Sequence, residues 1–272
     1  SRSAAFSFIL SLAVAAPLIT LTTDFGTSDH YVAAMKGVIL EICPDARLVD
    51  ISHDIAPYSI TEGAYTLAQA WHCFPLGTIH LIVVDPGVGS SRRPVLAEAG
   101  GHFFVAPDNG VLTLIYEAIR DQQVREITSA RFFRQPVSQT FNGRDIFAPV
   151  AAHLPGGTQS SDLGNLISDY VRLPIGRPVR AAAHTWTGII LKVDRFGNLI
   201  TNFDAAEFPG GFEIRIGFER ITHVATNYAD MPRGELFAIR GSSGYLEISV
   251  KEESAAARTK VGAGGAVELH LL

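Results

Sequence analysis

Cysteine is scarce in this chain of 272 residues, which contains only Cys43 and Cys73 and no CxxC pair. This scarcity excludes a disulfide scaffold and a cysteine-rich zinc module, so two buried free thiols are expected. Clusters of lysine and arginine are also missing, and the formal net charge is −5 at pH 7. A nucleic-acid partner is therefore excluded, because phosphate binding requires a basic surface.

Long apolar runs are missing too. No segment reaches the roughly 18 uninterrupted apolar residues that a membrane-spanning helix requires, so no membrane partner is expected. The N-terminus comes nearest, because Arg2 precedes the apolar run 4–16, and residues 13–15 have the small-x-small form of a signal-peptidase site. Residues 1–16 are interpreted as a possible signal peptide or as an N-terminal extension.

Motifs for phosphate, acyl and metal chemistry are absent as well. The chain contains no GxxxxGK[ST] string and no GxSxG elbow, and the glycine-rich run 87–92 lacks the third glycine of the dinucleotide fingerprint. Its nine histidines form no HxH, HxxxH or HExxH pattern. No metal site is therefore expected, and the nearby Asp50, His53 and Asp54 are interpreted as a local hydrogen-bonded group.

What the chain does contain is a large apolar fraction, 47% of its residues, which is enough to bury a core. Its 272 residues are enough for two modest domains or for one large one. Strand-like and helix-like runs alternate from residue 18 to about residue 153. The expected strands are Ile19–Thr23, Leu48–Ile51, Ile79–Val84 and His102–Ala106, and the expected helices are Tyr31–Ile42, Glu62–Trp71, Gly110–Ile119 and Ile146–His153. This alternation predicts an α/β domain with a mainly parallel sheet.

The pattern changes after Gly156, where glycine, serine and proline increase and helical periodicity disappears. Short strands are expected at Thr187–Val193, Leu199–Phe203, Phe212–Ile216, Ile221–Thr226, Leu236–Ile239, Tyr245–Val250 and Val267–Leu271. Their spacing predicts a small antiparallel β-barrel. The domain hypothesis is an α/β domain over residues 17–165, a linker over 166–183 and a β-barrel domain over 184–272.

Two carboxylates follow strands of the predicted α/β domain. Asp24 comes directly after the strand Ile19–Thr23, and Asp85 comes directly after Ile79–Val84. Ligands of open α/β sheets bind beyond the carboxyl ends of the strands, so both residues are candidates for a binding site.

Seven strings then occur in one order along the chain. They are TDFG (23–26), VDISH (49–53), VDPGVGSSRR (84–93), APDNG (106–110), TFNGRDIFAP (140–149), FGN (196–198) and SSGYLE (242–247). From about Pro17 to the C-terminus the chain resembles the adenosine-forming S-adenosyl-L-methionine hydrolases. These hydroxide adenosyltransferases are related to the S-adenosylmethionine-dependent fluorinase and chlorinase. The resemblance implies a homotrimer with each active site between the N-terminal domain of one subunit and the C-terminal domain of its neighbour.

The resemblance also implies a reaction, in which water or hydroxide attacks the ribose C5′ and releases adenosine and L-methionine. S-adenosylmethionine is then a small-molecule substrate, and no cofactor is expected because a sulfonium expels a neutral thioether. The implied catalytic residues are Asp85, Arg92 and Asn142. The implied substrate-binding residues are Asp24 and Asp29 for the ribose, Tyr58 and Phe141 beside it, Phe196, Tyr228 and Asn198 for the adenine, and Asp194, Ser242 and Glu247 for the methionine. Asp29 has an alternative interpretation as the N-cap of the helix that begins at Tyr31.

One residue departs from the family pattern. The family string is TFHGRD, and Asn142 stands at the histidine position. Asparagine can orient a water molecule, but it cannot take up a proton near pH 7. A halide adenosyltransferase and a catalytically weakened S-adenosylmethionine or adenosine binder therefore remain alternatives. The DPGVG string of hydrolase type and the short link between Arg92 and His102 favour hydroxide.

The compartment is not decided by these features. The substrate favours the cytoplasm, whereas the signal-like residues 1–16 leave export open.

Overall fold

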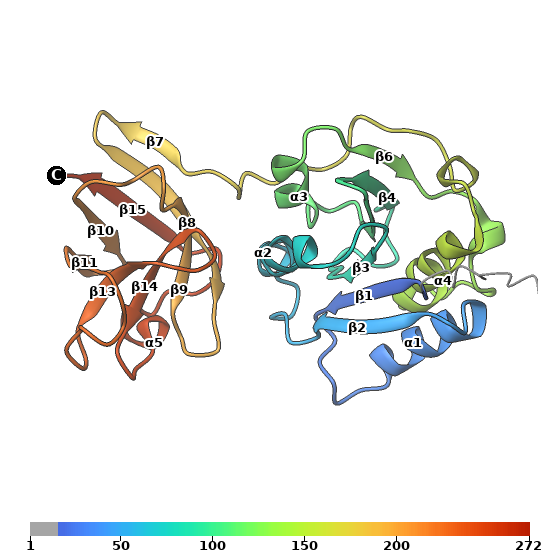
Figure 1. Cartoon of the computed structure of the whole chain (residues 1–272), viewed down its shortest axis with the longest axis horizontal. Coiled ribbons are helices and arrows are strands. Elements are labelled where there is room, and N and C mark those ends of the chain that lie inside the picture. Colours follow the sequence, from blue (N-terminus) through green and yellow to red (C-terminus); the bar gives the residue numbers. More distant parts are fainter. Residues whose placement is uncertain (1–15) are drawn as a thin grey trace, which may run out of the picture.

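The computed structural model describes residues 16–272, so the expected signal peptide or extension lies outside the described residues except for Ala16. Two β-sheets organise this part of the chain, and each sheet forms a unit of its own (Figure 1). The predicted combination of an α/β domain and a C-terminal β domain is confirmed. Over residues 16–272, no helix is both long and apolar enough to cross a membrane.

The first sheet has six strands in the order β2-β1-β3-β5-β4-β6. They are β1 (Leu18–Thr23), β2 (Arg47–Ser52), β3 (Ile79–Val83), β4 (Pro94–Ala99), β5 (His102–Pro107) and β6 (Gln123–Glu126). β1 pairs in parallel with β2 and β3, and β3 pairs in parallel with β5. β4 runs antiparallel to both of its neighbours. The sheet is therefore mainly parallel, as predicted, with one antiparallel edge.

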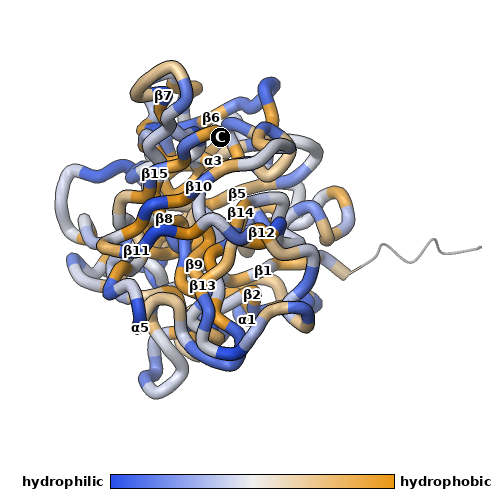
Figure 2. The backbone as a smooth tube through the Cα atoms, turned by 90° about the vertical axis from the view of Figure 1, so that its left-hand side faces the viewer, coloured by the Kyte–Doolittle hydropathy of each residue, from blue (hydrophilic) through white to orange (hydrophobic). Residues whose placement is uncertain are grey.

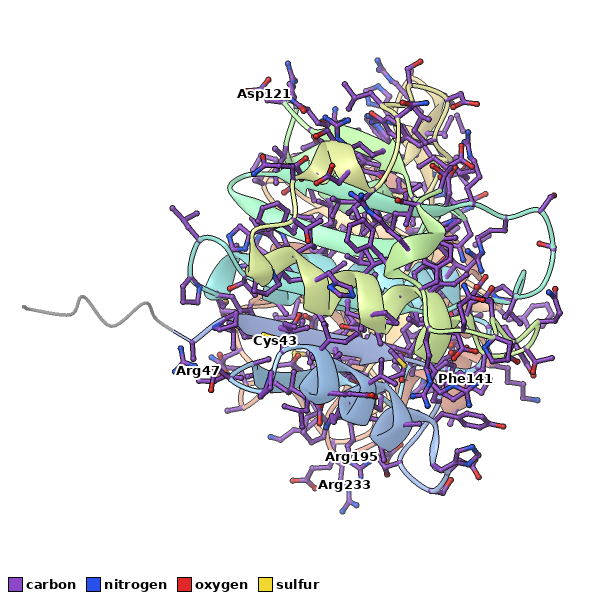
Figure 3. All side chains as sticks on the ribbon, turned by 90° about the vertical axis from the view of Figure 1, so that its right-hand side faces the viewer. Cys43, Arg47, Asp121, Phe141, Arg195 and Arg233 are labelled. Atoms are coloured by element: carbon purple, nitrogen blue, oxygen red, sulfur yellow. The ribbon has the colours of Figure 1, made fainter. Side chains whose placement is uncertain are left out.

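Helices cover both faces of this sheet. They are α1 (Tyr31–Ile42), α2 (Ile60–Ala70), α3 (Thr113–Ala118) and α4 (Ala148–His153), the last preceded by a π-helical turn over Gly143–Phe147. On one face, Met35 of α1 and Phe147 pack in a core with residues of α4, and Figure 3 shows this face with Phe141 at its edge. On the other face, Leu67 of α2 and Phe104 of β5 belong to a second core. Because both faces are covered, strands such as β3 are apolar throughout.

The antiparallel edge is the main departure from the predicted pattern. β4 joins β5 through Gly100 and Gly101, which both have positive φ angles, +58° and +78°. A tight two-residue hairpin turn requires such angles, and glycine adopts them at little cost. A Gly-Gly pair between extended runs is a hairpin signal, but the alanines and the glutamate of β4 favour a strand only weakly.

The second sheet is curled and mostly antiparallel, with the order β11-β10-β15-β8-β9-β14-β13-β12 and with β7 beside β8. Its strands are β7 (Val179–Ala182), β8 (Thr185–Val193), β9 (Leu199–Asp204), β10 (Phe212–Ile216), β11 (Glu219–Ile221), β12 (Val224–Ala225), β13 (Leu236–Arg240), β14 (Tyr245–Val250) and β15 (Ala266–Leu271). Phe203 and Phe212 lie in its core. Figure 2 shows apolar residues concentrated along β9 and β13.

Several details differ from the predictions for this second part. The segment Ile221–Thr226 is not one strand, because it is divided between β11 and β12. β7 lies inside the predicted linker, and α5 (Ala255–Thr259) follows β14 where no helix is expected. The cysteines are free, as predicted, but neither is buried, because Cys43 is only partly buried and Cys73 is exposed. The domain boundaries at residues 165 and 183 stay predictions.

The two units contact each other through α2, which lies on the side of the first sheet that faces the barrel (Figure 1). Glu62 of α2 is buried, and its Oε1 lies 3.1 Å from Nζ of Lys192 on β8. Tyr65 of α2 packs in an apolar cluster with Leu191 and Ile200 of the barrel. An ion pair between the buried Glu62 and the partly buried Lys192, beside an apolar contact, therefore joins the two units.

A buried polar group lies within the first sheet. Nδ1 of His80 on β3 lies 2.8 Å from the Thr20 hydroxyl oxygen, and its Nε2 lies 3.2 Å from Nδ1 of His102. Burial, and then the neighbouring His102, lower the pKa of His80 to about 3. His80 is therefore held in its neutral form over the ordinary pH range.

This pKa predicts a loss of stability in acid. Between the unfolded value near 6.5 and about 3, the unfolded chain binds a proton that the folded chain does not. The free energy of unfolding should therefore fall as the pH falls from 6.5, by about 2 kcal/mol at pH 5. Urea unfolding of the wild type and of His80→Gln at pH 7 and pH 5 measures this. Equal pH dependence in both proteins would contradict the assignment.

Candidate active site

A cavity of about 330 Å³ lies at the carboxyl ends of β1 and β3. We call it the N-pocket; its lining is Asp24, Phe25, Tyr31, Pro57, Tyr58, Val83, Asp85, Val88, Thr140, Phe141, Asn142 and Gly143. The two strands are parallel neighbours with Thr23 beside Val83, and β2 lies on the other side of β1. The strand order thus reverses at β1, which is where open α/β sheets bind ligands. The structure brings Asp24 and Asp85 together at this point.

Asp85, Arg92 and Asn142 form one hydrogen-bonded group in the N-pocket. Arg92 Nε donates to Asp85 Oδ1 at 3.0 Å, and the Arg92 terminal nitrogen donates both to Asp85 Oδ2 and, at 3.2 Å, to Asn142 Oδ1. The side chains of Arg92 and Asp85 are only 8% and 5% exposed. Paired, forked contacts of this kind orient a guanidinium and a carboxylate rigidly.

The glycine-rich loop between Asp85 and Arg92 permits this pairing. Gly89 has a φ of +79°, and a Cβ at this position would lie 2.5 Å from the carbonyl oxygen of Gln139. Any other residue would therefore clash with the backbone of the segment that leads to Asn142. The loop serves to bring two segments of backbone together around the ion pair.

The environment of Asp85 changes its proton affinity. Burial raises its pKa above the usual value, the charge and hydrogen bonds of Arg92 act in the opposite direction, and the nearby charge of Asp24 raises it further. Asn142 is also largely buried, and its Nδ2 donates to the carbonyl oxygen of Ser138 at 2.9 Å. The asparagine amide thus bridges Arg92 and the Ser138 backbone, a role that needs no proton uptake.

Asp24 is held by the loop before α2. Its Oδ2 accepts the backbone N–H of Tyr58 at 2.8 Å. Tyr58 has a φ of +66°, uncommon for a non-glycine residue, and its side chain is 74% exposed. The strained backbone therefore directs an amide at Asp24 and leaves the tyrosine ring free at the mouth of the N-pocket.

An aromatic wall completes the N-pocket. The rings of Tyr31 and Phe141 meet edge to face with centroids 5.1 Å apart, and Phe25 lies 6.2 Å from Phe141. Phe141 is a predicted site residue, whereas Phe25, Tyr31 and Thr140 are missed by the sequence analysis. Phe25 and Thr140 adjoin predicted residues in their strings, and this adjacency is the signal that could have identified them.

Asp29 is not brought to the N-pocket. It is exposed, and it does not line the N-pocket. Its alternative interpretation as a helix N-cap is wrong, because His30 occupies the N-cap position of α1.

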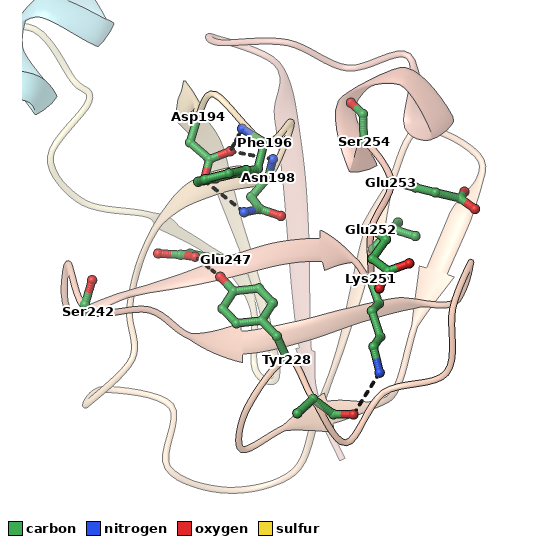
Figure 4. Close-up of a pocket in the computed structure, with 12 residues that line it drawn as sticks. Asp194, Phe196, Asn198, Tyr228, Ser242, Glu247, Lys251, Glu252, Glu253 and Ser254 are labelled. Carbon is green, nitrogen blue, oxygen red and sulfur yellow. Dashed lines mark hydrogen bonds between the residues drawn. The ribbon is translucent and has the colours of Figure 1, made fainter.

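A second cavity, of about 970 Å³, lies at one end of the barrel, and we call it the C-pocket. Its lining is Asp194, Phe196, Asn198, Tyr228, Ala229, Ser242, Glu247, Val250, Lys251, Glu252, Glu253 and Ser254 (Figure 4). All six residues predicted for the adenine and the methionine are among them. The sequence analysis misses the segment 251–254 between β14 and α5, because none of the seven strings includes it.

Asp194 orders one wall of the C-pocket. Its Oδ1 accepts the backbone N–H groups of Phe196 and Asn198 at 2.9 and 2.8 Å, and its Oδ2 accepts Nδ2 of Asn198 at 2.9 Å (Figure 4). These bonds close the turn between β8 and β9. The turn buries Asn198 and projects Phe196 with its side chain 78% exposed.

Tyr228 and Glu247 form the opposite wall. The Tyr228 hydroxyl donates to Glu247 Oε2 at 2.9 Å (Figure 4). Burial, and then this bond to Glu247, raise the pKa of Tyr228 to about 12. Burial also raises the pKa of Glu247, and the nearby charge of Asp194 adds to that effect. Two carboxylates in a partly buried cavity favour a ligand that carries positive charge.

The two pockets are separate within one chain. Among residues 16–272, no side chain lines both the N-pocket and the C-pocket. The exposed rings of Tyr58 and Phe196 lie at the N-pocket and the C-pocket, respectively.

Comparisons with known proteins agree with this geometry. Residues 19–164 match the N-terminal domain of the S-adenosyl-L-methionine hydroxide adenosyltransferases, and residues 188–268 match their C-terminal domain. The (R)-S-adenosyl-L-methionine hydrolase of Salinispora tropica is 38% identical, over 88% of this chain and 92% of its own. The enzyme of that name from Thermus thermophilus is 37% identical, over 86% of this chain and 91% of its own.

More distant relatives and solved structures agree as well. The fluorinase of Actinoplanes sp. is 27% identical, over 84% of this chain and 85% of its own. The crystal structure of an uncharacterized conserved protein from Thermotoga maritima superposes with a TM-score of 0.83 at 36% identity, covering 93% of this chain and 99% of that chain. The chain therefore belongs to the S-adenosyl-L-methionine hydroxide adenosyltransferase family.

Proposed function

We propose that the protein hydrolyses S-adenosyl-L-methionine to adenosine and L-methionine. The observation that carries this proposal is the group formed by Asp85, Arg92 and Asn142 at the point where the strand order reverses. Membership of the family supports the same reaction, since relatives at 35–38% identity are named (R)-S-adenosyl-L-methionine hydrolases.

The proposed chemistry is a displacement at the ribose C5′. A water oxygen forms the new bond to C5′ while the bond from C5′ to the sulfonium sulfur breaks, and that electron pair leaves on the neutral thioether of methionine. The water proton passes to Asp85, whose raised pKa makes it a better acceptor than an ordinary aspartate. Arg92 keeps the Asp85 carboxylate in position, and Asn142 accepts a further hydrogen bond from the Arg92 terminal nitrogen that also contacts Asp85.

The remaining residues bind the substrate in this proposal. Asp24 accepts hydrogen bonds from the two ribose hydroxyls, Phe196 and Tyr228 stack on the adenine, and Asn198 binds its edge. Asp194, Ser242 and Glu247 face the methionine ammonium. S-adenosylmethionine is the substrate in this scheme, and no cofactor is invoked. A cytoplasmic location stays a prediction.

The separation of the pockets supports a site shared between subunits. A substrate that needs Asp85 and Phe196 at once must contact two chains, because the residues line different pockets of one chain. We therefore propose a homotrimer in which the N-pocket of each subunit faces the C-pocket of the next. A heterologous contact of this kind closes into a ring when the rotation between subunits allows it.

A halide adenosyltransferase is the second candidate. The replacement of the family histidine by Asn142 favours considering it, and fluorinases are relatives at 24–27% identity. Incubation with S-adenosylmethionine, with and without fluoride or chloride, decides between the candidates. Adenosine is expected in both mixtures, a 5′-halo-adenosine would establish the halogenase, and binding without turnover would establish a weakened binder.

The proposed roles of Asp24 and Asp85 predict different kinetic effects. Asp24→Asn keeps an acceptor for the Tyr58 N–H but loses the charge, so KM should rise roughly tenfold or more with kcat little changed. Asp85→Asn keeps the shape but cannot accept the proton, so kcat should fall by about 10²–10⁴. Steady-state kinetics of this matched pair checks both effects. The reverse pattern, with Asp85 governing KM, would refute the roles.

The proposed role of Asn142 predicts that restoring the family histidine changes little. Asn142 already accepts from Arg92, and Asp85 already accepts the proton, so Asn142→His should change kcat by less than about tenfold. A pH–rate profile of both proteins measures this. A gain of a hundredfold, with a new limb near pH 6.5, would mean that the wild type lacks its base.

The shared site predicts that two inactive variants complement each other. Asp85→Asn disables only the N-pocket, and the double variant Phe196→Ala/Tyr228→Ala disables only the C-pocket. In a trimer that contains both variants, one of the three sites combines an intact N-pocket with an intact C-pocket, so about a third of wild-type activity should return. Co-expressed subunits that carry different tags, purified through both tags in succession, provide these mixed trimers. Activity that stays at the level of the separate variants would place each site within one chain.

A further inference from the structure

A second polar group lies beneath the loop that carries Asp24. His53 follows β2 and is almost fully buried. Its Nδ1 lies 2.8 Å from the hydroxyl of Thr23, the last residue of β1. The Thr23 hydroxyl also accepts the N–H of Phe25 at 3.3 Å, and the His53 carbonyl accepts the N–H of Gly26 at 2.8 Å. Three contacts to Thr23 and His53 therefore hold the two ends of the turn 23–26, with Asp24 inside it.

The far side of His53 faces charged groups. Its Nε2 lies 3.0 Å from Asp50 Oδ1, and Asp50 Oδ2 lies 2.6 Å from the Lys36 ammonium. The Nε2 geometry falls outside that of a regular hydrogen bond, so this contact is chiefly electrostatic. The Thr23 hydroxyl can accept two hydrogen bonds, so its bond from Phe25 does not decide whether Thr23 or His53 Nδ1 is the donor between them. The Asp50 carboxylate beside Nε2 favours the tautomer with the ring proton on Nε2.

We infer that Thr23 and His53 are positioning residues that set the direction of the Asp24 carboxylate toward the ribose of the substrate. This inference rests on the proposed function, because it assigns Asp24 to the ribose. The Tyr58 N–H holds one Asp24 oxygen from the front of the pocket. Thr23 and His53 hold the backbone of the same turn from behind. Contacts on two sides thus hold Asp24 in place, and its Oδ1 and the remaining lone pair of Oδ2 face the ligand in this proposal.

The same strand contains a matched pair that has no part in this turn. Thr20 of β1 contacts Nδ1 of His80 at 2.8 Å, the same distance as between Thr23 and His53, and all four side chains are buried. His80 lies in β3 and is surrounded by sheet residues and by His102. Each pair joins a buried threonine of β1 to a buried histidine, but only Thr23 also accepts the N–H of Phe25. Thr20→Val therefore controls for the loss of a buried threonine–histidine contact in this strand.

The test replaces each threonine by its isostere. Thr23→Val and Thr20→Val are compared with Thr23→Ser, which restores the hydroxyl, and with His53→Asn, which keeps an acceptor toward Thr23. Adenosine binding by calorimetry, steady-state kinetics with S-adenosylmethionine and urea unfolding are measured for each. Thr23→Val should weaken adenosine binding and raise KM about tenfold with kcat within about twofold, and Thr23→Ser and His53→Asn should stay within about threefold of the wild type. Thr20→Val should lose stability like Thr23→Val but bind adenosine as the wild type does.

The outcomes separate this inference from the proposed function. Suppose that the wild type is active. If Thr23→Val then binds adenosine normally, or if Thr20→Val and Thr23→Val lose affinity for adenosine equally, the positioning role alone is overturned. If Thr23→Val fails to fold, His53→Asn is compared with the more disruptive His53→Leu. Equal adenosine affinity and equal KM in these two variants would overturn the positioning role. A wild type that neither binds adenosine nor releases it overturns the proposed function and this assignment with it.

Discussion

The buried ion pair between Arg92 and Asp85 is the constraint on which the rest of the candidate site depends. Neither charge can be left alone in this surrounding, because removing one partner of a buried pair exposes the other to the full cost of desolvation. The pair fixes the end of β3, the path of the loop 86–91 and the place of Asn142. Gly89 is required because this pairing draws the loop against the carbonyl oxygen of Gln139.

The two pockets divide the chemistry between the two sheets. The N-pocket has the rigid charged group suited to a reacting water, and the C-pocket has the exposed aromatic faces and acidic groups suited to a cationic nucleoside. The contact between Glu62 and Lys192 and the apolar cluster around Tyr65 join the two units of the chain that carry these pockets.

Much of the fold and of the site follows from local patterns in the sequence. The strand–helix alternation predicts the parallel part of the first sheet, and Asp24 and Asp85 are recognisable as carboxylates after apolar strands. The strings around Asp194 and Glu247 mark residues that line the C-pocket. The antiparallel strand β4 is not predicted, because its alanines and glutamate have little strand preference and are held by pairing with β5 and β6.

The sequence by itself determined the two sheets and the strand-end carboxylates Asp24 and Asp85, since periodicity and turn residues are local properties. Its resemblance to the family supplied the remaining site residues and the histidine that Asn142 replaces. Tertiary structure decided that Asn142 bridges Arg92 and the Ser138 carbonyl, that Asp29 stays away from the N-pocket, and that the N-pocket and the C-pocket are separate. The bond from Asn142 to Ser138 spans only four residues, but the contact with Arg92 joins residues 50 apart, and each pocket combines segments that are distant in the sequence. Such contacts are set by packing and by burial of charge, which no single stretch of sequence encodes.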